Sequence, residues 1–337
     1  MEQNIIKQNI GIDIAKDDFK VCFSAMSGNF RIKILGSRTF SNNFKGFNEF
    51  LIWIKSKCKT SENLHFTMEA TGVYYESLAY FLWKIPDFKI QVVLPNKVKH
   101  YAKSLDFKSK TDKIDAQILA RFGLERALQV WQPISENLLE LKQLTRERDM
   151  LIRHKTAVAN QLHAAEHQGK VNKKIIVRTR KHIVLLDKQV KEIEKEIKTI
   201  VNEDDKLKKK FAYLQSIPGV STLTIATVVA ETNGFETFTN IKQLISYAGL
   251  DVRIVESGKW KGESHISKRG NSHIRKALYM PSLSRVCYDK SAKQFYENLK
   301  ERKGQDKSMV ALVAVQRKML GLMFSLWKNE QMYNIID

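Results

Sequence analysis

The feature that most constrains the fold is a long stretch, residues 134–200, that contains no proline and a single glycine, Gly169. Proline breaks helices and glycine weakens them, so such a stretch favours long helices. In its second half, apolar residues step by three and four: Ile183, Leu186, Val190, Ile193, Ile197 and Ile200. In its first half, Leu144, Leu151 and Val158 recur every seven residues. This spacing predicts an antiparallel coiled-coil hairpin, broken near residues 169–172, which we interpret as a spacer and dimerisation arm.

The residues before this hairpin predict an α/β domain. Residues 9–24 and 29–39 alternate apolar and polar side chains, which predicts two or three antiparallel strands. Further strands are predicted at 64–68 and 88–94, and helices at 41–57, at 73–83 and from 95 onward. Hairpin strands followed by β–α units form a mixed sheet. The first domain is therefore predicted to span residues 1–133.

The hairpin domain is predicted to span residues 134–204, and a mainly helical domain residues 205–337. Within the latter, Pro218 and Gly219 separate two helical patterns. This resembles a helix-hairpin-helix element, in which the turn at Gly219 would offer backbone N–H groups to a DNA phosphate. A Pro-Gly pair between helices is also an ordinary turn. Residues 253–268 have poor periodicity and are predicted to form a loop.

The charge of the chain predicts a polyanionic partner. Lys and Arg number 57 and Asp and Glu 36, which gives a net charge of +21. A potential of this sign attracts nucleic acid. Nucleic acid is therefore favoured over an acidic small substrate or a membrane surface.

Three further features favour a cytoplasmic protein. The chain has three widely separated cysteines, Cys22, Cys58 and Cys287. They form neither a disulfide framework nor a four-cysteine zinc site. The chain does not begin with a basic segment followed by an apolar one, so no signal peptide is predicted. The most apolar stretch, residues 309–327, carries Gln316, Arg317 and Lys318 and is predicted to be an amphipathic helix rather than a membrane span.

Four carboxylates stand out in this basic chain. Asp13 ends the apolar run of the first predicted strand, and Glu69 ends the strand at 64–68. Asp112 and Asp115 are spaced i and i+3 on a predicted helix, which places them on one face. Carboxylates at one point repel unless divalent cations neutralise them. The arrangement predicts a two-metal phosphodiester site, in which Mg²⁺ ions about 3.5 to 4 Å apart hold the attacking and leaving oxygens.

Each carboxylate also has an ordinary structural interpretation. Asp13 fits a turn at a strand end, Glu69 fits an ion pair and Asp112 fits a helix N-cap. His65 and His100 lie close in sequence and are candidate ligands, although a surface or core role is commoner for a histidine. The spacing leaves these alternatives open.

A second cluster, residues 253–276, is basic. Its cations are the candidate nucleic-acid contacts: Arg253, Lys259, Lys261, Lys268, Arg269, Arg275 and Lys276. Cations interleaved with Trp260 and histidines are typical of phosphate and nucleic-acid binding. Ser257 lies in this loop, where its hydroxyl is a candidate nucleophile toward a bound phosphate. Ser-Gly is also common in turns, and Ser264 and Ser267 are equal candidates.

Several motifs together resemble one protein family. The N-terminal motifs are GIDIAK at 11–16, MEATGVY at 68–74 and KTDKIDA at 110–116. The C-terminal motifs are SIPGV at 216–220, YAGL at 247–250, ESG at 256–258, SKRGN at 267–271 and RKAL at 275–278. In this order, and over nearly the whole chain, they resemble the DEDD transposases of bacterial insertion sequences. That family includes the Piv-type invertases and the bridge-RNA-guided recombinases.

The resemblance implies a fold and a reaction. The N-terminal domain is expected to be RuvC-like, with an RNase H fold, and its acidic tetrad maps onto Asp13, Glu69, Asp112 and Asp115. The C-terminal transposase domain is expected to supply Ser257 as the nucleophile. The residues after this serine, 259–261, depart from the small residues of many relatives. The implied reaction is DNA strand exchange through a covalent phosphoserine intermediate, assisted by Mg²⁺ or alternatively Mn²⁺.

The resemblance also implies partners. In the family, a structured guide (bridge) RNA encoded by the element pairs with donor and target DNA and chooses the sites. When base pairing selects the DNA sequence, the protein needs to recognise only the backbone and shape of the nucleic acid. A diffuse positive charge is suited to that. The family acts in the bacterial cytoplasm, at the nucleoid, as homo-oligomers, both dimers and tetramers. Active sites are composed from different protomers, so Asp13 and Ser257 are expected to act together across chains.

Two other functions fit the residues less well. The first is a metal-dependent RuvC-like nuclease or junction resolvase, in which Ser257 is only a turn residue; it predicts hydrolysed products and no protein–DNA adduct. The second is a nucleic-acid-binding protein without activity. It predicts that Asp13→Asn changes nothing except local stability.

Overall fold

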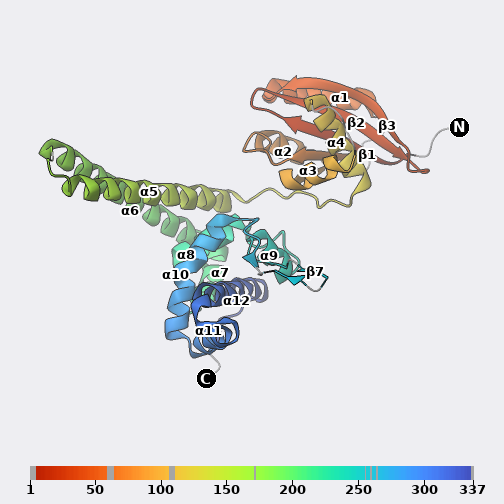
Figure 1. Cartoon of the computed structure of the whole chain (residues 1–337). Coiled ribbons are helices and arrows are strands. Elements are labelled where there is room, and N and C mark those ends of the chain that lie inside the picture. Colours follow the sequence, from red (N-terminus) through yellow and green to blue (C-terminus); the bar gives the residue numbers. More distant parts are fainter. Residues whose placement is uncertain are drawn as a thin grey trace. The chain divides into compact units, whose positions relative to one another are not determined.

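The structure is a computed structural model that describes residues 5–58, 64–105, 111–170, 172–254, 256–258, 260–262 and 265–334. The chain divides into two compact units, Met1–Pro133 and Ile134–Asp337 (Figure 1). The first unit is mixed α/β and the second is mainly helical. At this level the predicted fold class, α/β followed by all-α, is confirmed.

A five-stranded mixed sheet forms the centre of the first unit, in the order β3-β2-β1-β4-β5. Its strands are β1 (Ile5–Ile14), β2 (Asp18–Ser27), β3 (Ile32–Ser41), β4 (Leu64–Glu69) and β5 (Lys89–Val93). The first three pair antiparallel, whereas β4 runs parallel to β1 and β5 parallel to β4. The alternating segments at 9–24 and 29–39 therefore form three hairpin-connected strands, as their pattern predicts.

Helices pack on both faces of this sheet. They are α1 (Phe44–Lys57), α2 (Glu76–Trp83), α3 (Pro95–Lys103) and α4 (Asp112–Glu125). Ile10 and Ile12 of β1 share a core with Phe50 of α1 and Leu78 of α2. The helix α4 packs across β1 and β2. Because side chains alternate along a strand, the even-numbered residues of β1 face α1 and the odd-numbered ones face α4. Residues 73–75, predicted as helix, form a turn before α2.

The second unit begins with the predicted pair of long helices. They are α5 (Glu136–Glu166) and α6 (Lys173–Glu203), and α5 packs along α6. Leu186, Ile193 and Ile197 of α6 are buried in one core that also contains Met319 and Leu320 near the C-terminus. The segment 134–204, which the sequence pattern separates as a domain, therefore shares its hydrophobic core with the C-terminal helices.

The rest of the second unit is a group of shorter helices with one small β insertion. The helices are α7 (Asp205–Gln215), α8 (Thr222–Glu231), α9 (Ile241–Tyr247), α10 (Ser272–Tyr288), α11 (Lys290–Lys303), the 3₁₀ helix η1 (Gln305–Lys307) and α12 (Ser308–Asn329). Between α9 and α10 lie four short strands: β6 (Val252–Arg253), β7 (Glu256–Ser257), β8 (Trp260–Lys261) and β9 (His265–Ile266). The predicted loop at 253–268 thus contains two small two-stranded sheets.

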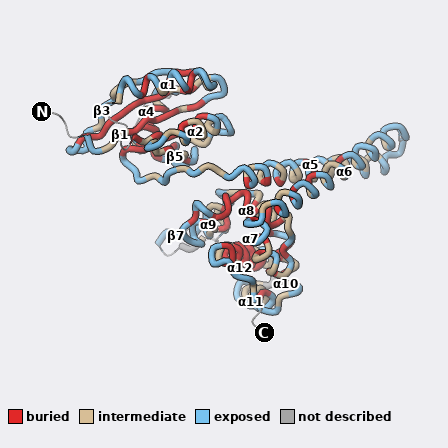
Figure 2. Tube along the Cα trace, turned by 180° about the vertical axis from the view of Figure 1, so that it is seen from behind, coloured by how far each residue is buried: buried red, intermediate tan, exposed pale blue. Residues whose placement is uncertain are grey.

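The helix α12 is long and apolar enough, by length and composition, to cross a membrane. Half of its most apolar window is buried inside the second unit (Figure 2). Met319, Leu320 and Met323 have no exposed surface, whereas Lys318 is exposed. The helix is therefore amphipathic and packs as a core helix of this unit.

Candidate functional site

The first candidate site depends on how closely α4 packs against β1. Gly11 lies on the odd-numbered side of β1. A Cβ atom at Gly11 would lie 2.1 Å from the Ala120 nitrogen and 2.2 Å from the Ala116 oxygen. Only glycine permits such an approach between backbones. The start of α4 therefore lies close to Asp13, at the end of β1.

Polar side chains on the same side of β1 fix the register of α4. The Asn9 amide donates a hydrogen bond to the Ala120 carbonyl at 2.7 Å and accepts one from the Thr67 hydroxyl at 3.0 Å. The Lys7 ammonium donates to a carbonyl in the last turn of α4 at 2.5 Å. Because α4 runs antiparallel to β1, holding its last turn at Lys7 places its first turn at Asp13. Sequence reasoning missed Asn9, although a polar residue within an apolar strand was a usable signal.

Three carboxylates meet at the start of α4. Asp13 of β1 and Asp112 and Asp115 of α4 each offer an oxygen atom, and these atoms lie within 4.8 Å of one another. β1 and β4 pair in parallel up to the residues just before Asp13 and Glu69. Glu69 therefore lies at the end of the strand that neighbours the strand of Asp13. The structure thus gathers three of the four predicted carboxylates and places the fourth on the adjacent strand end.

These carboxylates repel one another. Burial, followed by the charges of Asp115, Asp112 and Glu69, raises the pKa of Asp13 to about 6. Lys20, which lies opposite Asp13 on β2, counteracts this shift and forms an ion pair with Asp112. A divalent cation would relieve the repulsion, and carboxylate oxygens are the ligands that Mg²⁺ and Mn²⁺ prefer. The residues present therefore fit such a cation.

The structure also shows local contacts that bear on the ordinary structural roles of Asp112 and Glu69. The N-cap of α4 is Thr111, whose hydroxyl accepts a hydrogen bond from the Ile114 N–H at 3.3 Å. The N-cap interpretation of Asp112 is therefore wrong, because Asp112 is already the first residue of the helix. Glu69 accepts a hydrogen bond from the Thr71 hydroxyl at 3.0 Å.

Neither candidate histidine joins the acidic cluster. His65 lies at the other end of β4 and is hydrogen-bonded to the Gln91 amide at 3.1 Å, and burial lowers its pKa to about 4. His100 is exposed on α3. Among the described residues, the trio formed by Asp13, Asp112 and Asp115 is the one group of three or more potential metal ligands.

The second candidate site contains Ser257. This residue lies at the tip of the hairpin formed by β7 and β8, opposite Trp260. Gly258 follows it with a φ of 57°, a left-handed conformation that favours glycine. Ser257 itself is exposed. Lys259 and Ser264 lie outside the described residues. Ser257 is thus an exposed residue at the turn end of this hairpin.

Polar contacts hold together the base of this serine loop. The Ser267 hydroxyl donates to the Asp251 carboxylate at 2.5 Å, and the Ser267 N–H to the Asp251 carbonyl at 2.8 Å. The Arg275 guanidinium donates to the carbonyl oxygens of Ala248 at 2.8 Å and Gly270 at 3.2 Å. Ser267 and Arg275 therefore contribute to the loop base through their own hydrogen bonds.

The other predicted nucleic-acid contacts differ from one another in exposure and in ion pairing. Arg253, Lys268 and Arg269 are exposed around the loop, and Lys261 lies in β8. Lys276, on α10, forms an ion pair with Asp149 of α5. Among the predicted contacts whose side chains the structure describes, Arg253, Lys268 and Arg269 are thus exposed cations with no described ion pair.

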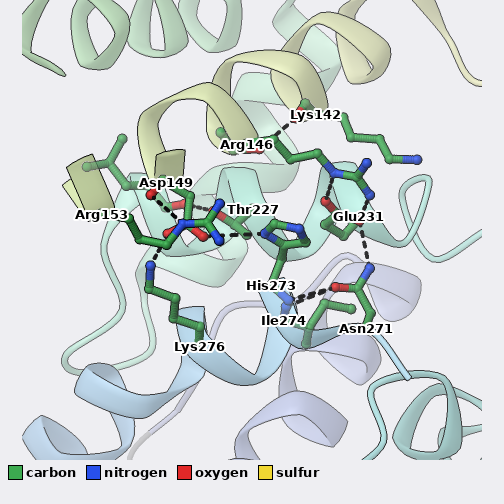
Figure 3. A network of polar contacts seen from close by, with 12 residues as sticks. Lys142, Arg146, Asp149, Arg153, Thr227, Glu231, Asn271, His273, Ile274 and Lys276 are labelled. Atoms are coloured by element: carbon green, nitrogen blue, oxygen red, sulfur yellow. Dashed lines mark hydrogen bonds and ion pairs between the residues drawn. The ribbon is translucent and has the colours of Figure 1, made fainter. Parts of the chain in front are cut away.

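An ion pair between Arg146 and the buried Glu231 joins α5 to the end of α8, and Asn271 links the end of the serine loop to it (Figure 3). The Glu231 side chain has no exposed surface, and Arg146 of α5 binds its two oxygens at 2.6 and 2.9 Å. The Asn271 amide also donates to Glu231, at 2.6 Å. The Asn271 oxygen accepts from the backbone N–H groups of His273 and Ile274. Asn271 therefore caps α10 and fixes the end of the loop on Glu231.

Sequence reasoning did not identify this network. Burial alone would raise the pKa of Glu231, but hydrogen bonds from Arg146 and Asn271 outweigh it and hold the pKa below its usual value. A second contact of α5, this one with α10, joins Asp149 to Lys276 and, at 3.6 Å, to His273. The available signal was a glutamate that ends the apolar run of α8.

The predicted turn at Gly219 lies between α7 and α8. Gly219 has a φ of 80°, and a Cβ atom there would lie 2.9 Å from the Ser284 Cβ of α10. Both its conformation and its packing therefore require glycine. Its contact with a DNA phosphate stays a prediction.

Comparison with known proteins places both sites within transposase sequences. Residues 10–166 match a family model described as transposase, and residues 212–297 match one described as transposase of the IS116/IS110/IS902 family. The chain is 31% identical to the pilin gene-inverting protein of Moraxella bovis, over 97% of this chain and 98% of that protein. It is 30% identical to the protein of the same name from Moraxella lacunata, over the same shares. It is 26% identical to the transposase of insertion element IS1111A from Coxiella burnetii, over 90% and 85% of the two chains.

Proposed function

The chain belongs to the IS116/IS110/IS902 family of transposases, and we propose that it exchanges DNA strands through a phosphoserine intermediate at Ser257, assisted by a divalent cation. The observation that carries this proposal is the gathering of Asp13, Asp112 and Asp115 around the end of β1. Carboxylates clustered in a protein of net charge +21 point to a cation rather than to an anionic ligand.

The acidic cluster would hold Mg²⁺ or Mn²⁺ through Asp13, Asp112, Asp115 and Glu69. Such an ion, when bound, neutralises phosphate oxygens and activates an oxygen nucleophile. The chain itself supplies the support of the cluster. Asn9 and Lys7 hold α4 in register, and Gly11 permits its close approach. The RuvC-like assignment of this unit rests on the resemblance of its motifs.

The serine loop would supply the covalent chemistry. As the Ser257 oxygen forms a bond to phosphorus, the bond from phosphorus to the leaving strand breaks, and the serine proton passes to the leaving oxygen. A hydroxyl of another strand then reverses the step, which restores the serine. One phosphodiester replaces another, so the exchange needs no external energy source. The exposed cations Arg253, Lys268 and Arg269 would hold the phosphates.

We also propose the partners that the family resemblance implies. These are donor and target DNA, a guide RNA encoded by the element, and further copies of the chain in dimers and tetramers. Asp13 and Ser257 lie in different units of the chain. A composite active site, with Asp13 of one protomer and Ser257 of another, is part of this proposal. The reaction would take place in the bacterial cytoplasm.

The test is an adduct assay. Purified protein is incubated with Mg²⁺, the RNA transcribed from the non-coding end of the element, and labelled junction DNA, and a denaturation-resistant protein–DNA species is sought. Ser257→Ala and Asp13→Asn should both abolish it. Asp17→Asn, which removes the same charge from an exposed residue of the same unit, should not. Cleavage that persists in Ser257→Ala, with no adduct in any sample, would contradict the proposal and would indicate a metal-dependent nuclease instead.

A further inference from the structure

The charges of the hairpin formed by α5 and α6 are segregated along its length. Its distal part, residues 153–182, is here named the hairpin tip. The tip holds eight Lys and Arg and one acid, Glu166, for a net charge of +7. The remaining hairpin residues, 136–152 and 183–203, hold seven Lys and Arg and nine acids, for a net charge of −2. The tip thus carries one third of the net charge of the chain, +21.

No described part of the second unit covers the tip. Leu151 and Leu186, 7% and 4% exposed, are the last buried residues toward it, and no described residue between them is buried. In Figures 1 and 2, α5 and α6 continue beyond the other helices of their unit as a pair with a largely exposed surface. From Leu186 back to the start of α6 this pair extends about 20 Å, at 1.5 Å per residue.

Most cations of the tip have no acidic partner among the residues that the structure describes. Arg180 forms an ion pair with Glu166 at 2.7 Å and Lys155 one with Asp187 at 2.5 Å. Of the other six tip cations, Arg153 donates a hydrogen bond to the Asp149 backbone carbonyl at 3.3 Å. Within the described residues, the remaining five form no ion pair: Lys170, Lys173, Lys174, Arg178 and Lys181. All five are exposed. This end of the hairpin therefore presents a positive surface that the described residues of the second unit do not neutralise.

Three of these cations form a stripe on α6. Lys174, Arg178 and Lys181 are spaced i, i+4 and i+7 and therefore share one face of the helix. Like charges at this spacing destabilise a helix by themselves. Binding to a polyanion removes that repulsion and releases counterions from the polyanion.

We propose that the hairpin tip binds the phosphate backbone of duplex DNA through this stripe and the adjacent Lys173. The stripe is about 10 Å long, which matches roughly three phosphate steps of one DNA strand. Duplex DNA is the polyanion proposed because transposases act on DNA. The contact is independent of Ser257 and of any metal, and it assigns the hairpin a function beyond assembly.

The experiment compares two variants of the full-length chain. The tip variant combines Lys173→Gln, Lys174→Gln, Arg178→Gln and Lys181→Gln. The matched control combines Lys188→Gln, Lys191→Gln, Lys195→Gln and Lys198→Gln, which removes four exposed charges from the same helix, of which Lys188 pairs with Glu192 at 3.8 Å. Fluorescence anisotropy measures binding to a labelled 40-base-pair duplex, and to a structured RNA, over a series of salt concentrations. Circular dichroism and light scattering report the fold and the oligomeric mass.

The tip variant should bind the duplex at least about tenfold more weakly than the wild type at low salt, and its slope of log K against log salt should fall by about 3. The control should change the slope by less than about 1. Equal effects in both variants would mean that only total charge matters and would overturn the proposal. Unchanged duplex binding would also overturn it, whether or not RNA binding or the oligomeric mass changes.

Discussion

Removal of Arg146 tests how the buried carboxylate of Glu231 is stabilised. In Arg146→Ala, Glu231 keeps the Asn271 amide but loses two charge-assisted hydrogen bonds, of 2.6 and 2.9 Å. Removing one partner of a buried ion pair costs about 3 to 5 kcal/mol. The Glu231 side chain has no exposed surface, but that of Arg146 is 49% exposed, so water screens the pair. We therefore expect the lower end, about 3 kcal/mol, at pH 7.5.

The cost of Arg146→Ala should shrink as the pH falls. In the wild type the pKa of Glu231 lies below its unfolded value of 4.5. The stabilisation of the folded state by the ionised Glu231 is therefore present above pH 4.5 and is lost as the pH falls through the pKa of Glu231 in the folded state. In the variant, burial dominates and raises the folded pKa above the unfolded one. The folded state of the variant then takes up a proton more readily than its unfolded state. Its stability relative to the wild type should therefore rise as the pH is lowered from 7.5 to 5.

Hydrogen exchange of the α8 amides in increasing urea measures the free energy of unfolding of the second unit within the full chain. The measurements are made at pH 5.0 and 7.5. The control is Arg180→Ala, because the side chains of Arg180 and its partner Glu166 are 65% and 33% exposed. That variant should lose less than about 1 kcal/mol. A cost of Arg146→Ala that is equal at both pH values, or as small as that of the control, would refute the reasoning.

Three further predictions concern the two sites. Gly11→Ala forces a Cβ atom to within 2.2 Å of α4, so it should lower the melting temperature and abolish any Mg²⁺-induced thermal shift; an unchanged shift would contradict the packing argument. Asp13→Asn removes repulsion from a carboxylate whose pKa is raised to about 6, so in EDTA it should stabilise the protein by about 1 kcal/mol, and a loss of stability would contradict this. Gly270→Ala places a Cβ atom 2.3 Å from the Tyr247 carbonyl, so it should accelerate proteolysis within residues 252–266; an unchanged cleavage rate would count against the described loop base.

The sequence by itself determined the elements whose signal is local. The heptad spacing and the lack of proline in 134–200 specify α5 and α6, because helix periodicity is set within a few residues along the chain. Alternation in 9–24 and 29–39 specifies the hairpin strands in the same way. The motifs around Asp13, Glu69 and Asp112 identified the family, which the comparisons confirm.

The tertiary structure decided which distant residues meet. Asp13 meets Asp112 only because Gly11 permits the close approach of α4 and Asn9 fixes its register, and neither contact has a local signature. The same holds for Glu231, whose partner Arg146 is 85 residues away in the chain. A buried carboxylate needs a partner, but the sequence does not specify which cation will lie beside it in the folded chain. Long-range pairing depends on how the packed elements fit together, and only the folded chain specifies that fit.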